Sequence, residues 1–157
     1  MPKHKQQGND NRRVKSISPE KALYILQKSP SREECLKLEE RLKHAPSDTS
    51  YKCVLKCLDV EIDILALLEH NVDQITTIDQ IEKLNEKARL INNKIKEVHI
   101  QNNELVDDFK KEVNTFKNKC LSKIDAFKEK FEKKKNKLKE EEMSQVKESQ
   151  QKMNSDI

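Results

Sequence analysis

The chain has 157 residues, of which 38% are charged, 34% hydrophobic and 4% aromatic, with one glycine and four prolines. A single glycine cannot supply the turns of a β-sandwich or barrel, or the glycine-rich phosphate loops of a doubly wound α/β enzyme. The formal net charge of +4 is too small to indicate nucleic-acid binding by itself. The composition therefore predicts an all-α, elongated protein.

Charge alternates along the chain. Residues 1–18 carry a net charge of +4, residues 48–82 a net charge of −6, and residues 128–139 a net charge of +5. This alternation favours packing beside partners of complementary charge.

The four cysteines are Cys35, Cys53, Cys57 and Cys120. The segment Met1 to Asn11 is polar and basic, without a hydrophobic leader, and no apolar run approaches the roughly 18 residues of a membrane span. We therefore expect reduced thiols and a cytoplasmic protein, free or peripheral on an organelle membrane or cytoskeletal structure.

Residues 1–17 are expected to form a disordered basic tail, and residues 18–70 a small helical bundle. Ser18 and Pro19 are typical of a helix start, and Pro30 ends that helix. Ser31 to Glu34 forms a capping box for a second short helix, which runs to about His44 with Cys35, Leu36, Leu38 and Leu42 inward. Ser47 or Asp48 is expected to cap a third helix, 48–70.

The helix at 48–70 carries two apolar stripes, each with spacings of four and three, about 200° apart around the helix. A helix with two opposed apolar faces lies between two neighbours. The predicted bundle core consists of one stripe of Tyr51, Leu55, Leu58, Ile62 and Leu65 and another of Cys53, Cys57, Val60, Ile64 and Leu67.

The apolar phase slips at residues 71–77, which predicts either a turn between helices or a stutter in one long helix, with the turn favoured. Asn71 fits a C-cap, and Thr77 to Gln80 forms a T-x-x-Q capping box.

Residues 78–131 are expected to form a coiled coil, within one helix that runs from 78 to about 145. Such a helix is longer than the chain's other helices combined, so its apolar side should need partner chains. Asn102 is expected to set register, and eleven-residue spacings after Phe109 predict a nearly straight path. The predicted partner interface is Leu84, Ala88, Ile91, Ile95, Val98, Asn102, Leu105, Phe109, Val113, Phe116, Cys120, Ile124, Phe127 and Phe131.

Residues 132–157 read as a charged helical tail that frays, with sparse apolar anchors at Leu138, Met143 and Val146. The segment Lys128–Lys139 either forms a solvated helix face or binds nucleic acid, microtubules or an acidic membrane surface.

Chemistry-bearing motifs are weak. Cys53 and Cys57 lie one turn apart, but the sequence offers no second ligand pair for zinc, so they are expected to be core thiols. No nucleophilic triad, metalloprotease motif or phosphate loop is present, which predicts a non-enzyme with no cofactor, metal or small-molecule substrate. Ser16 and Ser18 fit kinase patterns, and phosphate on Ser18 would favour the helix that it begins.

Residues 73–109 resemble small coiled-coil subunits of the biogenesis of lysosome-related organelles complex and its sister lysosome-positioning complex, snapin- and pallidin-like. The residues that carry this resemblance are Asp73, Gln74, Ile75, Ile78, Asp79, Glu82, Lys83, Leu84, Ala88, Asn92, Asn93, Asn102 and Leu105. The resemblance implies a short helical protein in an elongated hetero-oligomer on endosomes or lysosomes.

The sequence thus predicts a non-enzymatic coiled-coil subunit that scaffolds a multi-subunit helical assembly, with a hetero-oligomer favoured over a homodimer. The resemblance places it in endosome or lysosome biogenesis or positioning. The alternatives are a kinetochore, centrosomal or microtubule-associated coiled-coil subunit, or an electrostatic binder that uses Lys128–Lys139.

Overall fold

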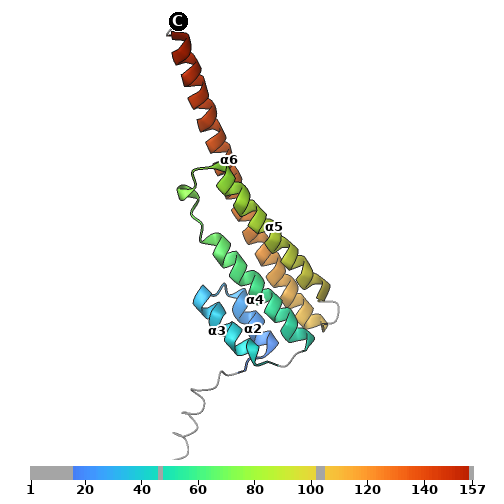
Figure 1. The fold of residues 1–157 in the computed structure, drawn as a ribbon. Helices are drawn as coiled ribbons and strands as arrows, with labels where there is room; N and C mark the ends of the chain where they lie inside the picture. Colours follow the sequence, from blue (N-terminus) through green and yellow to red (C-terminus); the bar gives the residue numbers. More distant parts are fainter. Residues whose placement is uncertain (1–15, 46–47, 102–104, 156–157) are drawn as a thin grey trace, which may run out of the picture.

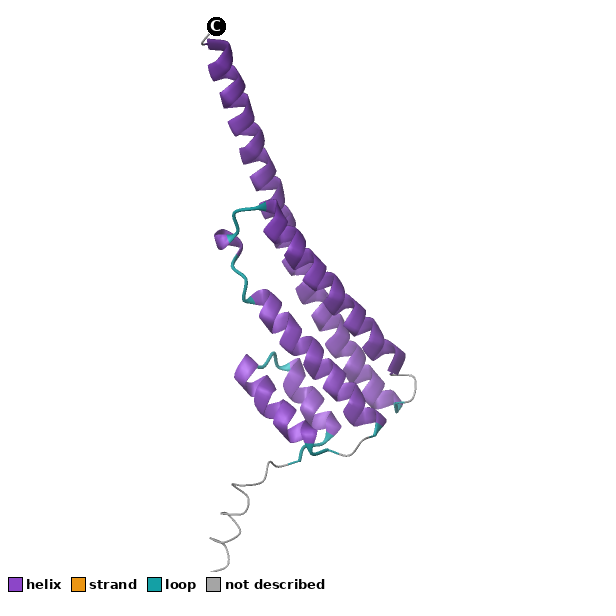
Figure 2. Cartoon of the chain, in the orientation of Figure 1, coloured by secondary structure: helices purple, strands orange, loops and turns teal. Residues whose placement is uncertain are grey.

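The structure, a computed structural model, describes residues 16–45, 48–101 and 105–155 (Figure 1). The described residues form α-helices, one short 3-10 helix and no β-strand (Figure 2). In chain order these are α2 (Pro19–Gln27), α3 (Arg32–Lys43), α4 (Thr49–Leu68), η1 (Val72–Gln74), α5 (Ile78–Gln101) and α6 (Asp107–Ser155). The prediction of an all-α, elongated fold is confirmed.

Helix α4 lies at the centre and packs against α2, α3, α5 and α6. Helices α5 and α6 run antiparallel beside it, and the short pair α2 and α3 covers its other side (Figure 1). The last part of α6 projects alone beyond the other helices, which makes the molecule elongated.

Polar side chains near the helix starts satisfy amide groups that have no partner within the helix. Ser18 caps α2 with Pro19 at its first position, and Asp48 caps α4 by accepting from the Tyr51 amide at 3.0 Å. The capping box of Ser31 and Glu34 opens α3. Before α5, Gln80 accepts from the Thr77 amide at 3.1 Å while Thr77 Oγ1 accepts from the Gln80 amide at 3.2 Å.

A single apolar core runs through all five described α-helices. The part of α6 in this core, which we call the α6 stripe, is fully buried and comprises Phe109, Val113, Phe116, Cys120, Ile124, Phe127 and Phe131. At its end the rings of Phe127 and Phe131 lie with centroids 4.2 Å apart. Leu138, partly buried, is the last α6 residue that packs against the core.

The predicted single helix from 78 to about 145 is wrong. Helix α5 ends at Gln101 and α6 begins at Asp107, and the two lie side by side along the molecule. This reversal lets each helix cover the other's apolar stripe, so the coiled-coil pattern is satisfied largely within one chain. The alternative left open at residues 71–77 is also settled, because α4 ends at Leu68 and α5 starts anew at Ile78.

Three smaller expectations need correction. Ile17, placed in the disordered tail, is buried in the core, because an apolar residue before an N-cap folds back onto the first helical turn. Leu55 is 38% exposed and Leu36 48% exposed, because α4 and α3 each leave one side uncovered. Asn71 begins η1 instead of ending α4, accepting from the Asp73 amide. Residues 1–15 lie outside the described residues.

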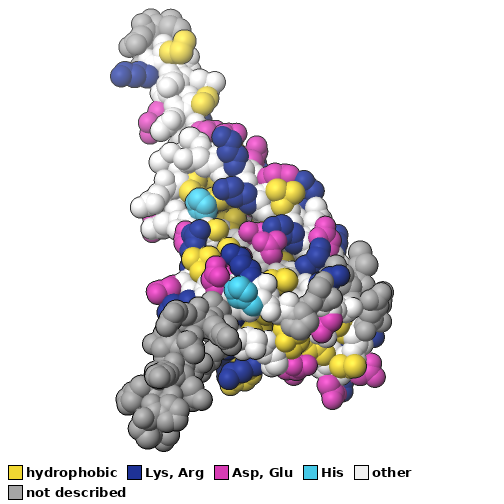
Figure 3. Space-filling view, turned by 60° about the horizontal axis from the view of Figure 1, so that its bottom comes forward, with side chains coloured by type: hydrophobic (Ala, Val, Ile, Leu, Met, Phe, Trp, Pro, Cys, Tyr) yellow, Lys and Arg dark blue, Asp and Glu magenta, His cyan; other side chains and the backbone are white. Residues whose placement is uncertain are grey.

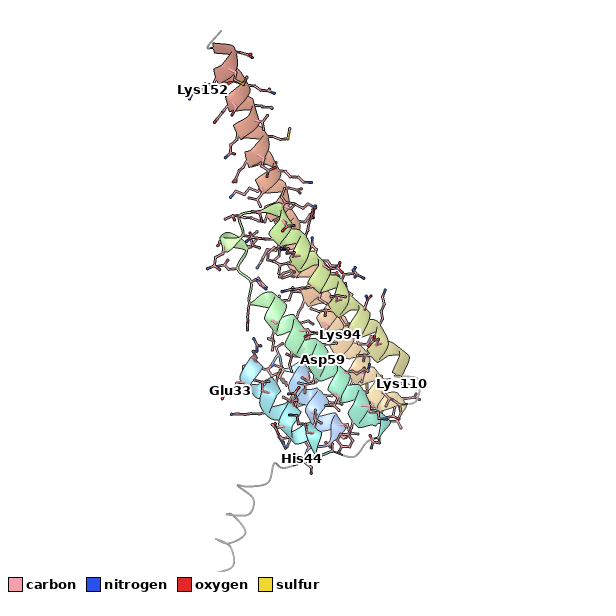
Figure 4. All side chains as sticks on the ribbon, viewed as in Figure 1. Glu33, His44, Asp59, Lys94, Lys110 and Lys152 are labelled. Carbon is pink, nitrogen blue, oxygen red and sulfur yellow. The ribbon has the colours of Figure 1, made fainter. Side chains whose placement is uncertain are left out.

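Charged side chains cross between neighbouring helices at the edges of the core. Lys94 of α5 reaches Asp59 of α4 at 3.0 Å and Asp63 at 2.5 Å, and Figure 4 shows Asp59 and Lys94 on adjacent helices. Its carboxylate partners raise the pKa of Lys94. One turn away, Lys56 pairs with Glu97 at 3.2 Å. Partly exposed pairs of this kind contribute little stability each, but they fix how α4 and α5 align.

Replacing Phe116 by alanine tests the internal burial of the α6 stripe. Phe116 is 2% exposed, so Phe116→Ala should lower the free energy of unfolding by about 3–5 kcal/mol. The measurement is urea denaturation followed by circular dichroism. As a control, Val146→Ala, at a side chain 56% exposed, should change it by less than about 0.5 kcal/mol. Equal, small effects at both positions would mean that the chain does not bury this stripe itself.

Candidate functional site

The residues predicted to bind partner chains lie in the chain's own core. The buried ones are Leu84, Ala88, Ile91, Ile95, Val98, Leu105, Phe109, Val113, Phe116, Cys120, Ile124, Phe127 and Phe131, and Asn102 lies outside the described residues. As a free partner interface this set is wrong for the folded chain, because α4, α5 and α6 cover it mutually. A charge at Ile95 or Phe109 would therefore disrupt the fold itself.

The two stripes of α4 differ in burial. Cys53, Cys57, Val60, Ile64 and Leu67 are all fully buried, whereas of the other stripe only Leu58 is. Tyr51, Ile62 and Leu65 are partly buried against the core, and Leu55 is exposed. Val54 and Glu61 are buried as well, and the sequence pattern did not single them out.

All four thiols are free and buried. Burial raises the pKa of Cys35 to about 11 and that of Cys120 to about 12, with Glu61 contributing in the same direction. A hydrogen bond between Cys53 and Cys57 lowers the pKa of Cys53 and raises that of Cys57. Within the described ranges no group of three or more histidine, cysteine or acidic side chains is arranged to hold a metal ion. These thiols therefore have the environment of structural core residues.

Glu61 is the one charged residue in the described core, and it is 1% exposed. Its carboxylate lies 3.7 Å from Lys123 Nζ of α6, too far for a hydrogen bond, and Oε2 has no hydrogen-bond partner. Burial raises the pKa of Glu61, and Lys123 and Lys119 oppose that shift only partly. A sequence pattern gives no sign of this pairing, because the two residues belong to helices far apart in the chain.

Lysines of α6 bind the C-terminal end of α2. Lys119 Nζ donates to the Gln27 carbonyl oxygen, and Lys123 Nζ donates to Ser29 Oγ at 3.3 Å. Gln27 Nε2 in turn donates to the Glu112 carbonyl oxygen at 2.9 Å. Cations at a helix C-terminus interact favourably with its dipole, and α2 has no basic residue of its own in its last turn. These lysines thus have a structural role.

The lysines of 128–139 differ in their surroundings. Lys128 and Lys134 to Lys135 are half-buried beside the bundle, whereas Lys130, Lys133, Lys137 and Lys139 are exposed. Lys133 pairs with Glu129 on its own helix at 3.7 Å. Lys130, Lys133 and Lys137 recur at i, i+3 and i+7 and so share one side of α6, whereas Lys139 lies on another side. Whether the segment is a solvated helix face or binds a charged partner stays a prediction.

The bundle leaves the part of α6 beyond the core uncovered. Residues 139–155, which we call the C-terminal extension, are helical, and every side chain described from 139 to 154 is exposed. The extension is about 25 Å long at 1.5 Å per residue. Lys152 stands on it far from the bundle in Figure 4.

Apolar residues of the extension follow a heptad. Met143 is 62% exposed, Val146 is 56% exposed and Met153 is 69% exposed. With Gln150 they fall at spacings of three, four and three, the a and d positions of a coiled coil. We call these four residues the C-terminal seam. The sequence analysis predicts a fraying tail with anchors at Met143 and Val146, and that prediction does not include the register with Gln150 and Met153.

Hollows elsewhere are shallow. The groove between α4 and α5 has a volume of about 280 Å³, and its walls include Ala66, Leu67, Leu90 and Ile91. Asp63 and Lys94 at its edge already pair with each other. In Figure 3 the hydrophobic side chains of the visible face are interspersed with charged ones.

Ser16 and Ser18, which fit kinase patterns, are both exposed. Ser18 Oγ accepts from the Lys21 amide at 3.2 Å as the N-cap of α2, and the Ser16 carbonyl oxygen accepts from Arg41. Their modification stays a prediction.

Comparison with known proteins gives no relative: no family model, curated protein or solved structure matches the chain. Among the described residues no helix is long and apolar enough to cross a membrane.

Alkylation tests the burial of the thiols. Because thiolate is the reactive form, Cys35 and Cys120 in the folded protein should react with iodoacetamide at least roughly a hundredfold more slowly than in urea. Peptide mass spectrometry measures each rate. A thiol introduced by Ser144→Cys on the exposed extension should react equally fast in both conditions, and native rates for Cys35 and Cys120 near that reference would contradict their burial.

Glu61→Gln tests the cost of the buried carboxylate. The folded-state pKa is raised, so the folded protein holds the Glu61 proton to higher pH than the unfolded chain, and stability falls as pH rises from the ordinary glutamate pKa through the folded one. Near pH 4 the variant and the wild type should have the same free energy of unfolding. At neutral pH the free energy of unfolding of the variant should be higher. Urea denaturation across pH measures the difference, and a gap that shrinks as pH rises would contradict the assignment.

Proposed function

We propose that this protein is a non-enzymatic scaffold subunit that joins a helical assembly through its C-terminal extension. The observation that carries the proposal is that α6 continues past the last core residue with an exposed heptad of Met143, Val146, Gln150 and Met153. The bundle holds the base of this helix, so the extension is presented in a fixed direction (Figure 1).

Energetics supports pairing of this segment. An isolated helix of the extension's length is marginal in water, whereas pairing buries apolar area at about 25 cal/mol per Å². The three exposed apolar side chains of the C-terminal seam lie on one side of the helix, so a coiled-coil partner could remove them from water. The partner class is therefore another coiled-coil helix, as the heptad rule requires.

The cellular setting is a separate part of the proposal. Placement on endosomes or lysosomes follows only from the resemblance of residues 73–109, and the described residues of that range belong mainly to α5. Those residues serve the internal core, so the resemblance supports a helical assembly subunit more directly than it supports one organelle.

Two double substitutions that introduce positive charge test the proposal. Met143→Lys with Val146→Lys places two cations in the C-terminal seam, and Ser144→Lys with Gln145→Lys places the same charge outside it. Tagged chains are recovered from cells after cross-linking, and partners are identified by quantitative mass spectrometry. We expect the first variant to lose at least roughly tenfold of its coiled-coil partners, including untagged copies of itself, and the second to keep them.

A partner counts only if it is identified and re-forms a complex with the purified chain. Circular dichroism must show that both variants keep a folded bundle. If both variants recover the same partners as the wild type, assembly does not use the C-terminal seam and the proposal fails.

A further inference from the structure

We propose that the partner of the C-terminal seam is a second copy of this chain, aligned parallel and in register. The inference rests on the proposed function, since it names the partner of that same segment. It departs from the hetero-oligomer expected from the sequence, because the α5–α6 pairing buries the long apolar stripe and leaves the heptad of the C-terminal extension exposed. The charged residues beside the C-terminal seam then indicate which protein chain pairs with it.

The heptad fixes those positions. With Met143 at a and Val146 at d, Glu142 falls at g and Lys147 at e. In a parallel coiled coil a g residue faces the e residue five positions later on the other helix. Glu142 therefore faces Lys147 of the second copy, and by symmetry the pair occurs twice.

The preceding heptad does not extend the seam, because Asn136 falls at a and Lys139 at d. Lys135 at g and Glu140 at e have opposite sign, but Lys135 is half-buried beside the bundle. The final g and e positions hold Ser149 and Asn154, which carry no charge. The charged g–e pair within the seam is thus Glu142 with Lys147, and it is attractive.

An antiparallel dimer lacks this complementarity. There, g faces g and e faces e. In the antiparallel register that covers the whole C-terminal seam, Met143 lies opposite Met153, and Lys147 lies near Lys147 of the second copy. Gln150 lies at an a position. A polar side chain there favours the register in which it lies opposite the same residue of the other helix, so Gln150 also favours the in-register parallel dimer. The charges and Gln150 both select the parallel arrangement.

The folded chain leaves these charges available. Glu142 and Lys147 are exposed, and within the described residues neither has an ion-pair partner. Five residues apart on one helix they do not face each other, so they cannot satisfy each other within the chain. Their complementarity has an effect only between two chains.

The bundle does not block the second copy. At about 100° per residue, the centre of the C-terminal seam lies roughly a quarter turn around α6 from the centre of the α6 stripe. The α6 stripe faces α4 and α5, and Lys128, Glu129 and Glu132, nearer the seam's side of α6, line a groove with α5. The second copy can therefore pair only beyond residue 139, where α6 projects past the other helices (Figure 1). In a parallel pair the two bundles would lie on opposite sides of the shared axis.

The test uses purified full-length chains and sedimentation equilibrium over a roughly hundredfold range of concentration. Only about two heptads contribute, so we expect a weak, concentration-dependent dimer of the wild type. Glu142→Lys alone, or Lys147→Glu alone, should weaken dimerisation about fivefold to tenfold by creating like-charge pairs. The double variant, and an equimolar mixture of the two single variants, should regain wild-type affinity.

A matched control is Glu148→Lys, which makes the same charge change at an f position away from the seam and should leave the affinity unchanged. The relative direction of the two paired helices is measured with the Gln150→Cys variant under mild oxidation. A parallel in-register dimer forms a disulfide between the two introduced thiols, found as one symmetric cross-linked peptide, whereas an antiparallel pair does not.

Several outcomes overturn the inference: a wild-type chain that stays monomeric throughout, a dimer indifferent to Glu142→Lys, a mixture that does not recover affinity, or no symmetric cross-link. If the purified chain is monomeric while Met143→Lys with Val146→Lys still loses an identified partner from cells, the proposed function stands and only the second copy is rejected. If that double variant loses nothing, the proposed function fails too.

Discussion

The structure depends on the burial of the α6 stripe against α4 and α5. Four phenylalanines lie on this one stripe, and each buried aromatic side chain removes a large apolar area from water. Because α5 doubles back into α6 between Gln101 and Asp107, two amphipathic segments of one chain cover each other. Without that reversal the same residues would need a second protein.

Polar groups around this core mainly determine how the helices align. The Lys94 pairs with Asp59 and Asp63 hold α5 against α4, and Lys119 and Lys123 hold α6 at the end of α2. Glu61 is different, since burying a carboxylate with only a distant lysine carries a free-energy penalty. Among the described core residues Glu61 is thus a charged group whose burial costs free energy, and it lies where α4 meets α6.

The internal pairing also narrows the function. Under the proposed function, because the chain buries its main coiled-coil stripe internally, partners would bind the C-terminal extension. Its apolar residues are few, so the charges beside them have a large share in the choice of partner and direction. A rigid bundle with a short pairing helix is suited to bringing copies or subunits together reversibly.

The candidate site could be predicted from sequence only in part. Met143 and Val146 were visible as apolar positions, but their heptad matters only once the stronger Leu84–Phe131 pattern is known to be occupied. Other interactions join residues that are far apart in the chain, such as Glu61 with Lys123 and Lys119 with the end of α2. Local periodicity carries no information about such contacts.

Much of the local structure follows from the residues alone: helix class from composition, helix starts at Ser18, Ser31 and Thr77, a start at Ser47 or Asp48, and a phase change at 71–77 for which a turn is favoured over a stutter. These features follow from short-range hydrogen bonding and backbone preference, which residues three or four apart specify. What covers the long apolar stripe depends on how the helices pack in the folded chain. An amphipathic helix looks the same whether its own chain or another protein covers it, and the reversal after Gln101 occurs without glycine or proline to mark it.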